Sequence, residues 1–298
     1  MKKRFGDRFD GKLIRDLDSL HFIMPFIYPN RCDNEAYISQ VMDLTAAEKY
    51  LEKKNKDNDG YHYTLFQLVI TALFKTLILR PKMNRFIVNN SLYQRTQISA
   101  SFAVKREFKD SGEEGLAFVY GNRADTLETI HDKMYREIYE ARNVSGGNAT
   151  EKMDVFNVLP RFIGRRIVKT LCWLERHGKM PESLTKGDPC YASVFVTNLG
   201  SIGMDAGYHH LANWGTNSIF VVLGEMKKRP FTDQNGKTKM KTSVDMGFTL
   251  DERIADGYYY SRTVKLFKYL LEHPEELEYR LDEKPHTKIK TKARGSKR

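Results

Sequence analysis

Apolar and polar residues along this chain follow two periods, one of about 3.6 residues and one of two, which are typical of helices and strands. The helical period predicts a helix from Thr45 to about Lys54, because Thr45-Ala46-Ala47-Glu48 has the form of a capping box. A second capping box, Thr64-Leu65-Phe66-Gln67, opens a helix that ends before Pro81. Apolar residues cover most of the circumference of this second helix, so we expect it to be buried and central.

Three more segments have the helical period. A third helix is predicted to begin at Asp125-Thr126-Leu127-Glu128. Residues 155–174 are apolar and basic, which predicts one or two amphipathic helices, and the Ser/Gly/Asn loop at residues 143–150 marks a flexible break before them. The last helix is predicted over residues 263–271, with Pro274 ending it.

Alternation with the period of a strand occurs in five segments: residues 98–104, 116–120, 192–197, 218–223 and 242–250. The first two are expected to pair as a hairpin. The last two are joined through Asn235-Gly236, and Asn-Gly is a strong signal for a hairpin turn. Because strands and helices intermix without a regular order, we predict an α/β fold with a mixed β-sheet covered by helices.

The composition is that of a globular protein. Of the 298 residues, 41% are hydrophobic and 29% are charged. No run approaches the roughly 18 apolar residues of a membrane span, and Asp7 and Asp10 lie where a signal peptide needs its apolar region. We therefore expect a cytoplasmic protein with no membrane partner. The cysteines, Cys32, Cys172 and Cys190, are too widely spaced to indicate a disulfide framework or a zinc site, so no metal is expected.

The positive charge of the chain is concentrated at its end. The net charge is +11, but residues 284–298 contain seven basic residues and no acidic ones. Removing those seven leaves +4 for residues 1–283, which is ordinary for a globular domain. We therefore predict a basic, disordered tail over residues 284–298. Nucleic acid is expected as a partner only through this tail, and a solubilising tail is the alternative.

The most informative segment is the one at residues 246–257. It is strand-like up to Leu250, four of the next six residues are charged, and Asp256-Gly257 closes it. A charged turn after a strand often delivers a reactive side chain into a cleft. The sequence therefore predicts a functional site at this turn.

At these residues the chain resembles the chloramphenicol acetyltransferase-like acyltransferases, which include the dihydrolipoyl acyltransferase core of 2-oxo acid dehydrogenase complexes. Their signature is Asp-His-Arg-x-x-Asp-Gly. This chain reads Asp251-Glu252-Arg253-Ile254-Ala255-Asp256-Gly257, so every fixed position matches except the catalytic histidine, which is replaced by Glu252.

Two further segments are similar to the same family. Phe195-Val196-Thr197-Asn198-Leu199-Gly200 resembles its Phe-Thr-Ile-Ser-Asn-Leu-Gly segment, and Leu223-Gly224 followed by Arg229-Pro230 resembles another strand and turn. Order and spacing hold from about Arg8 to Glu283, so a free-standing catalytic-type domain is expected over residues 1–283. Residues 143–188 depart from the family and are expected to be an atypical insertion.

The resemblance implies a two-layer α/β sandwich and a homotrimer with active sites at the subunit interfaces. It also implies coenzyme A as co-substrate, with a thiol, hydroxyl or amine of a small molecule as acyl acceptor. By position, Glu252 takes the place of the general base, the Thr197 hydroxyl stabilises the oxyanion, and Asp256 is the structural carboxylate. The same positions make Asn198, Arg253 and Gly257 supporting residues.

Glu252 leaves three hypotheses open. A solvated glutamate, with a pKa of about 4.3, is a poor base for a thiol near 8.5, and the mismatch costs roughly 5–6 kcal/mol unless burial raises the carboxyl pKa. His209 or His210, about a dozen residues after Thr197, is the alternative base. In the third hypothesis the chain is an inactive trimeric homologue, a pseudoenzyme that acts as a scaffold or binds a CoA-type ligand. Taken singly, Thr197 could reflect only β propensity and Asp256-Gly257 only a turn.

Overall fold

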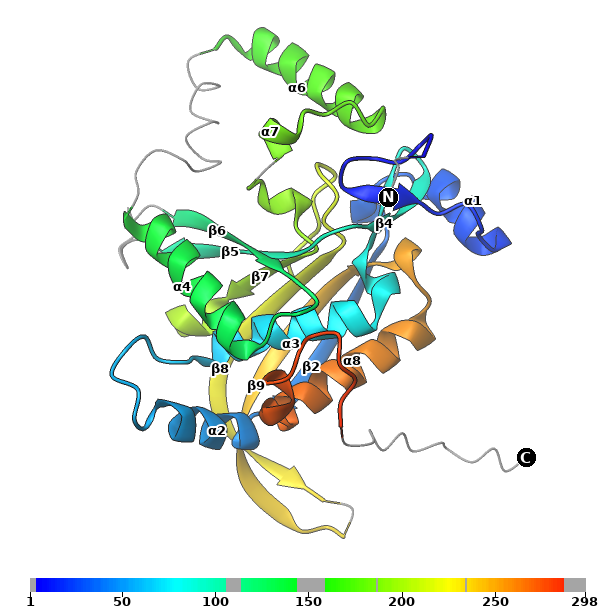
Figure 1. The fold of residues 1–298 in the computed structure, drawn as a ribbon. Coiled ribbons are helices and arrows are strands. Elements are labelled where there is room, and N and C mark those ends of the chain that lie inside the picture. The colour runs from blue at the N-terminus through cyan, green and yellow to red at the C-terminus, as the bar shows by residue number, and fades with distance from the viewer. Residues whose placement is uncertain (1–3, 106–113, 144–158, 186, 234, 287–298) are drawn as a thin grey trace, which may run out of the picture.

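A mixed sheet of six strands lies at the centre of the computed structural model, which describes residues 4–105, 114–143, 159–185, 187–233 and 235–286. The strand order is β2-β9-β8-β7-β5-β6, with β7 parallel to β5 and β8 and the other pairs antiparallel. The strands are β2 (Glu35–Asp43), β5 (Ile98–Lys105), β6 (Glu114–Gly121), β7 (Val194–Asn198), β8 (Ile219–Thr232) and β9 (Thr238–Asp251). All five predicted strand segments fall on these strands, so the mixed sheet is confirmed (Figure 1).

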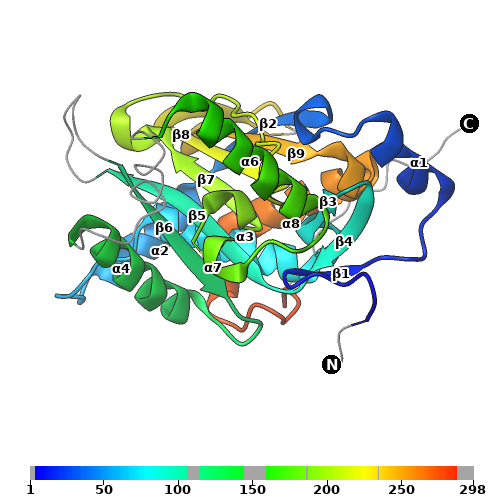
Figure 2. The ribbon, with the colours of Figure 1, turned by 90° about the horizontal axis from the view of Figure 1, so that it is seen from above.

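Four helices pack together on one face of this sheet: α2 (Thr45–Asn55), α3 (Leu65–Leu79), α4 (Leu127–Asn143) and α8 (Gly257–Glu272). Figure 2 shows them side by side under the sheet. Alternate strand residues such as Val196, Val221 and Phe248 point into the core between the sheet and these helices. The predicted central helix is confirmed as α3, in which twelve consecutive residues are buried.

Two helix starts show how local polar groups decide the boundaries. The capping box at Thr64 is confirmed, because the Gln67 side chain accepts the Thr64 N–H at 2.8 Å and Thr64 accepts the N–H of Gln67. The capping box at Thr45 is wrong. Thr45 is already the first helical residue of α2, and its N–H donates to the Asp43 carboxylate at 3.0 Å.

The last helix is longer than predicted. It begins at Gly257 rather than near residue 263, because the Asp256 carboxylate caps it and accepts the N–H of Tyr259 at 2.8 Å. The hairpin of β8 and β9 is also longer than predicted. Its two strands run on past the sheet and project from the bottom of the molecule in Figure 1.

Several short elements were not predicted from the sequence. A second sheet has the order β1-β4-β3, with strands β1 (Gly11–Leu13), β3 (Arg85–Val88) and β4 (Ser91–Arg95). Helix α1 (Ser19–Ile27) has apolar residues that are largely exposed, so it shows no buried stripe. The remaining short helices are η1 (Arg31–Asp33), η2 (Pro81–Asn84), η3 (Pro189–Tyr191), η4 (Leu199–Ile202), η5 (Glu252–Ile254) and η6 (Pro274–Leu277).

Helix α6 (Arg161–Arg176) and the short helix α7 (Glu182–Thr185) form the described part of the insertion and lie above the body in Figure 1. A buried ion pair fixes α6 to the N-terminal segment, since Arg8 contacts Glu175 at 2.9 Å and Tyr191 donates to the same carboxylate at 2.8 Å. The predicted flexible break and residues 155–158 of the predicted helix lie outside the described residues, apart from Asn143 at the end of α4.

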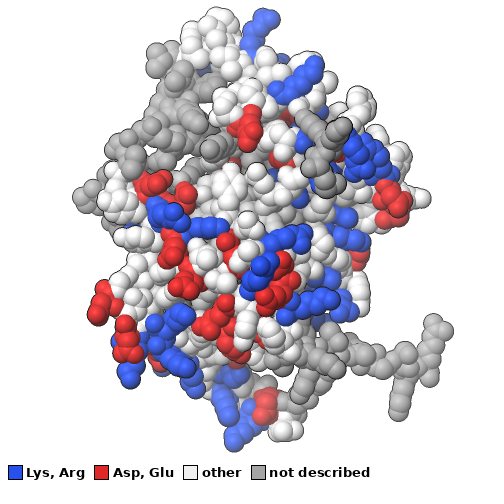
Figure 3. Space-filling view, in the orientation of Figure 1, with Lys and Arg blue, Asp and Glu red and all other residues white. Residues whose placement is uncertain are grey.

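The surface agrees with a globular body rather than one basic face. On the side seen in Figure 3, Lys and Arg are mixed with Asp and Glu over α2, α4 and α8, and basic side chains gather mainly at the projecting hairpin. Residues 287–298, most of the predicted basic tail, lie outside the described residues. In the part of the chain that is described, no helix is long and apolar enough to cross a membrane.

Candidate active site

The turn after β9 has a buried frame made of opposite charges. Asp251, the last residue of β9, is fully buried, and Arg253 in η5 is 2% exposed. The Arg253 Nε and Nη2 donate to the two oxygens of the Asp251 carboxylate at 2.8 and 2.7 Å. The third nitrogen, Nη1, donates to the carbonyls of Tyr28 and Pro29. A bidentate pair in which every guanidinium nitrogen donates a hydrogen bond is rigid, so it fixes the path of the turn.

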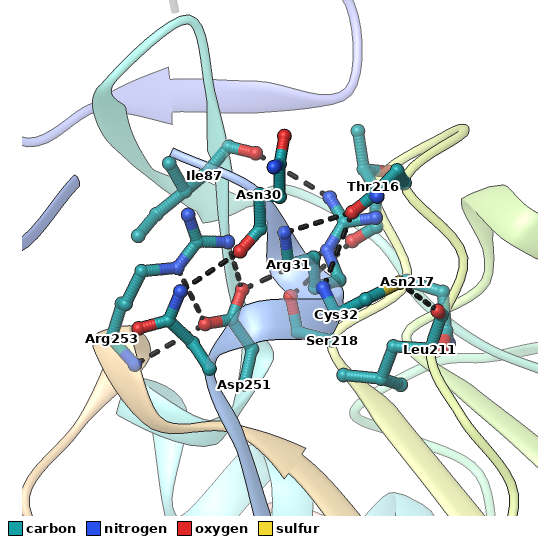
Figure 4. Close-up of polar contacts among 12 residues, drawn as sticks. Asn30, Arg31, Cys32, Ile87, Leu211, Thr216, Asn217, Ser218, Asp251 and Arg253 are labelled. Carbon is teal, nitrogen blue, oxygen red and sulfur yellow. Dashed lines mark hydrogen bonds and ion pairs between the residues drawn. The ribbon is translucent and has the colours of Figure 1, made fainter. Parts of the chain in front are cut away.

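A second arginine joins this frame from a distant part of the chain. The Arg31 Nε, in η1, lies 3.7 Å from the Asp251 carboxylate, and both side chains are buried. Its other nitrogens donate to the carbonyls of Ala212 at 2.6 Å and Gly215 at 3.0 Å. Burial lowers the pKa of Arg31, and the Asp251 carboxylate opposes this shift. Figure 4 shows both guanidinium groups directed at Asp251.

The two motif carboxylates that were predicted to act, Glu252 and Asp256, lie outside this frame. Both are exposed. The Glu252 N–H donates to the carbonyl of Asn34 at 2.8 Å, but its carboxylate has no hydrogen bond or ion pair with any described residue. Asp256 caps α8, and the N–H of Tyr259 holds its pKa below the usual value. Gly257 is the first residue of that helix.

Thr197 and Asn198 are the last two residues of β7, away from the turn that carries Glu252. Core residues Val194 and Val196 alternate with Thr197, so its side chain is on the face opposite the helices. Thr197 is opposite Val222 of β8, which is opposite Gly247 of β9. Two strand spacings, four residues along β9 and one residue of the turn separate the backbones of Thr197 and Glu252 by about 19 Å within the chain. One subunit therefore does not bring the two side chains together.

The segment from Gly203 to Asn217 crosses this face between the two ends. It passes so close to the sheet that a Cβ atom on Gly247 would collide with the carbonyl of Gly207. His209 stacks on Phe220 of β8 with ring centroids 4.4 Å apart, and Phe220 stacks on Phe195 at 4.7 Å. The segment then reaches the start of β2, where the N–H of Leu211 donates to the Glu35 carboxylate.

His209 and His210 therefore lie between Thr197 and Glu252 on this face. The segment is irregular rather than a strand, so the two rings do not point to opposite sides, and their centroids are 4.8 Å apart. Both are exposed. Glu35 is the strand partner of Asp251, which puts the end of this segment beside the turn that carries Glu252. Among the described residues no group of three or more His, Cys, Asp or Glu is arranged to hold a metal ion.

A cavity of about 960 Å³ opens beside the buried frame and under the insertion. Arg31, Arg253 and Trp214 line one end of it. Ile167 and Leu171 of α6 line another side. Charged side chains also line it from α4 (Glu137, Glu140) and from the end of α6 (Glu175, Arg176). A cavity with both apolar and charged walls suits a small organic molecule with polar groups.

Known proteins with similar sequences belong to one group of acyltransferases. Residues 168–279, which include Thr197 and the whole turn, match the family model of the 2-oxoacid dehydrogenases acyltransferase (catalytic domain). The lipoamide acyltransferase component of the branched-chain alpha-keto acid dehydrogenase complex of Bacillus subtilis (strain 168) is 23% identical over 236 residues, which are 79% of this chain and 45% of that protein. The chain thus spans about half the length of this curated relative.

Solved structures show the same fold. A probable dihydrolipoamide acetyltransferase from Listeria monocytogenes 4b F2365 superposes with a TM-score of 0.58 at 15% identity, covering 93% of this chain and 98% of that one. A chloramphenicol acetyltransferase superposes with a TM-score of 0.54 at 12% identity, covering 88% and 98%. Residues 168–279 of the chain are similar to the catalytic domain of the 2-oxoacid dehydrogenase acyltransferases. The resemblance drawn from the three motifs and the chloramphenicol acetyltransferase-like fold are both confirmed.

The residues predicted from the sequence include the exposed carboxylates of the turn but only part of its buried frame, which consists of Arg31, Asp251 and Arg253. Arg31 was not predicted, because nothing near it in the sequence marks it and its partners lie far along the chain. Asp251 stands in the motif but received no role. An available signal was its place as an acidic residue directly after a strand of apolar and β-branched residues, where burial demands a charged partner.

Proposed function

We propose that this chain is a cytoplasmic, CoA-dependent acyltransferase that works as a homotrimer and passes an acyl group to a thiol, hydroxyl or amine of a small molecule. The observation that carries the proposal is the position of Thr197 at the end of β7 and of Glu252 in the turn after β9, with the segment that carries His209 and His210 between them. Groups that act on one carbonyl must lie within about 3 Å of the reacting atoms. In a cyclic trimer, Thr197 of one subunit can face Glu252 of the next.

In this mechanism the Glu252 carboxylate takes the proton of the acceptor as its sulfur, oxygen or nitrogen attacks the acyl carbonyl. The Thr197 hydroxyl donates a hydrogen bond to the oxyanion. The thioester C–S bond then breaks, and the proton passes from Glu252 to the leaving sulfur of coenzyme A. A base of this kind needs a raised pKa, and burial of a carboxyl group in a subunit interface supplies one.

We assign the acceptor or the acyl group to the cavity beside Arg253. The cavity lies next to the frame of the turn, and α6 of the insertion forms part of its wall. In this proposal, the insertion shapes the specificity of the site, while Arg31, Asp251 and Arg253 keep the turn in place.

A second candidate function is that of a non-catalytic trimer that binds a CoA-type ligand. The observation that favours it is the exposed glutamate at the position of the family histidine. The two candidates predict the same fold and the same ligand, and they differ only in turnover.

The test measures acetyl-CoA binding and CoA release with a thiol, a hydroxyl and an amine acceptor for the wild type, Glu252→Gln and Glu252→His. If Glu252 is the base, Glu252→Gln lowers turnover by about 100-fold or more, and Glu252→His keeps or raises it. Turnover that survives Glu252→Gln moves the role to His209 or His210, which His209→Gln and His210→Gln then separate. Binding without turnover in all three proteins supports the second candidate.

Mixing two inactive subunits tests the interface. Thr197→Val and Glu252→Gln chains are co-expressed with different tags, and mixed trimers are purified through both tags. In a cyclic trimer that contains both chains, one of the three interfaces pairs an intact Thr197 with an intact Glu252, so activity returns to about one third of the wild-type level. No recovery in mixed trimers contradicts a site shared between subunits.

A further inference from the structure

A cluster of aromatic rings lies away from the acyltransferase turn, where the loop after α2 meets α4. Tyr63 stacks on His131 with ring centroids 3.9 Å apart. Tyr61 lies 5.2 Å from the same imidazole and 4.7 Å from Tyr135. These four rings line a cavity of about 350 Å³ that opens to the surface. The faces of aromatic rings are negative, so such a cavity attracts positive charge.

Two carboxylates add to this negative potential. Glu128 and Asp132 line the same cavity from α4. With His131 and Tyr135 they occupy helix positions i, i+3, i+4 and i+7, which form one stripe of α4. Both carboxylates are exposed, and neither has an ion pair with a described residue. The nearby Lys54 contacts Glu278 at 3.1 Å, and its ammonium lies 5.4 Å from the centroid of the Tyr63 ring.

The loop that carries two of the rings is held in place by asparagine side chains. The Asn55 side chain holds the backbone of Tyr63, because it accepts the Tyr63 N–H and donates to the Tyr63 carbonyl, each at 2.8 Å. Asn58 accepts the N–H of Gly60 and donates to the carbonyl of Tyr61. A site whose loop is already ordered loses less conformational entropy when a ligand binds.

His131 supplies an independent sign of a ligand. It is 7% exposed, and its Nδ1 is buried without a hydrogen-bond partner among the described residues. Burial lowers the pKa of His131, so the ring is neutral at pH 7 and does not repel a cation. A buried nitrogen without a partner is costly, and a hydroxyl group or a water molecule brought in with a ligand would satisfy it.

We propose that this tyrosine-lined cavity binds a quaternary ammonium group. Lys54 already lies over the Tyr63 ring, so the rings of Tyr61 and Tyr135, together with the Glu128 and Asp132 carboxylates, offer the negative faces and charge for a further cation. A quaternary ammonium is weakly hydrated and has no N–H to satisfy, so it gains more from aromatic faces than a primary ammonium does. This site is independent of acyl transfer and of Glu252.

The proposal is tested with choline, titrated by calorimetry into the full-length protein. We expect a dissociation constant on the order of 1 mM. The neutral isostere 3,3-dimethyl-1-butanol, which lacks only the charge, is expected to bind at least about tenfold more weakly. No saturation up to about 50 mM choline, or equal binding of the isostere, would overturn the proposal. A parallel titration with Nε-trimethyllysine decides whether the cavity prefers the quaternary ammonium of a small alcohol such as choline or that of a methylated lysine side chain.

Substitutions on α4 locate the binding. Tyr135→Ala is expected to weaken choline binding about tenfold, whereas Tyr135→Phe keeps the ring face and stays within about threefold of the wild type. Tyr139→Ala is the matched control, since Tyr139 contacts Tyr135 but does not line the cavity. Thermal melts of the three variants establish that they are folded. Unchanged binding in a folded Tyr135→Ala protein, or equal loss in Tyr139→Ala, excludes this cavity as the site.

Discussion

Asp251 and Arg253 lie inside the molecule, whereas Glu252, between them in the sequence, lies on its surface. The buried pair is satisfied within one chain, because every nitrogen of Arg253 donates to Asp251 or to a backbone carbonyl. The Glu252 carboxylate has no such partner among the described residues. The chain thus builds the frame of the turn by itself, while the surroundings in which Glu252 would act must come from elsewhere. We call the pair Asp251 and Arg253 the buried half of the turn and the exposed acidic residues Glu252 and Asp256 its exposed half. The two halves should respond differently to substitution.

The largest effect is expected from breaking the buried half. Asp251→Asn removes the charge that both Arg253 and Arg31 face, and it leaves two buried guanidinium groups without a counter-charge. Loss of one partner of a buried pair typically costs about 3–5 kcal/mol. Urea unfolding should therefore show a loss of this size in the free energy of unfolding.

The control for this prediction is an ion pair of the same type at the surface. The Asp245 carboxylate accepts hydrogen bonds from Nη1 and Nη2 of Arg229 on the hairpin of β8 and β9. The Asp245 side chain is 24% exposed and that of Arg229 is 31% exposed. Asp245→Asn is expected to cost about 1 kcal/mol or less, because water solvates the remaining charge. Equal losses in the two variants would mean that the frame around Asp251 contributes no more than a surface pair.

The exposed half should affect activity without affecting stability, and Thr197 tests this at the other end of the sheet face. Thr197→Val keeps the shape of the side chain, and the hydroxyl it removes has no hydrogen bond to a described residue. Loss of one oxyanion donor lowers kcat by about 100- to 1000-fold. Steady-state CoA release should show this loss with a thermal midpoint close to that of the wild type.

Thr197→Ser is the matched control, because it retains the hydroxyl and should keep most of the activity. A Thr197→Val protein as active as the serine variant would remove Thr197 from the mechanism. A Thr197→Val protein that unfolds early would instead show that the hydroxyl supports the fold, which the half-buried strand position does not suggest.

The difference between the two halves also explains what the sequence predicted well. The strands β5 to β9 and helix α4 were predicted because apolar residues recur at the period of the element, and α3 because apolar residues surround most of its circumference. Helix α1 has exposed apolar residues and an internal Pro25, and β1, β3 and β4 are three to five residues long, so neither shows a usable period. The start of α8 was predicted too late because the Asp256 carboxylate caps it, whereas the start of α2 at Thr45 was predicted correctly but with the wrong cap, since Asp43 accepts its N–H.

For the site, the motif located the turn but not the forces that hold it. Arg31 contacts Asp251 across most of the chain length, and no local pattern encodes that contact. The path of the segment that carries His209 and His210 depends on the close approach of Gly207 to Gly247, which only the folded chain shows. In the proposed trimer the partner of Glu252 comes from a neighbouring subunit, so neither the sequence pattern nor a single chain specifies it.

The smallest expected effect comes from Asp256, which lies in the exposed half but serves the fold as the cap of α8. Asp256→Ala should cost about 1 kcal/mol at pH 7. The folded-state pKa of Asp256 lies below its ordinary value of 3.8, so the contribution of the carboxylate is present above about pH 4 and is lost as the pH falls through the folded pKa. Urea unfolding at pH 7 and pH 3 should show the free energies of unfolding of the wild type and Asp256→Ala converging in acid.

Asp256→Asn is the control, because asparagine caps a helix without charge. It should match the wild type at pH 7 within about 0.5 kcal/mol and lack this acid-dependent part. A large loss of CoA release in Asp256→Asn with unchanged stability would place Asp256 with Glu252 in the chemistry rather than with Asp251 in the frame.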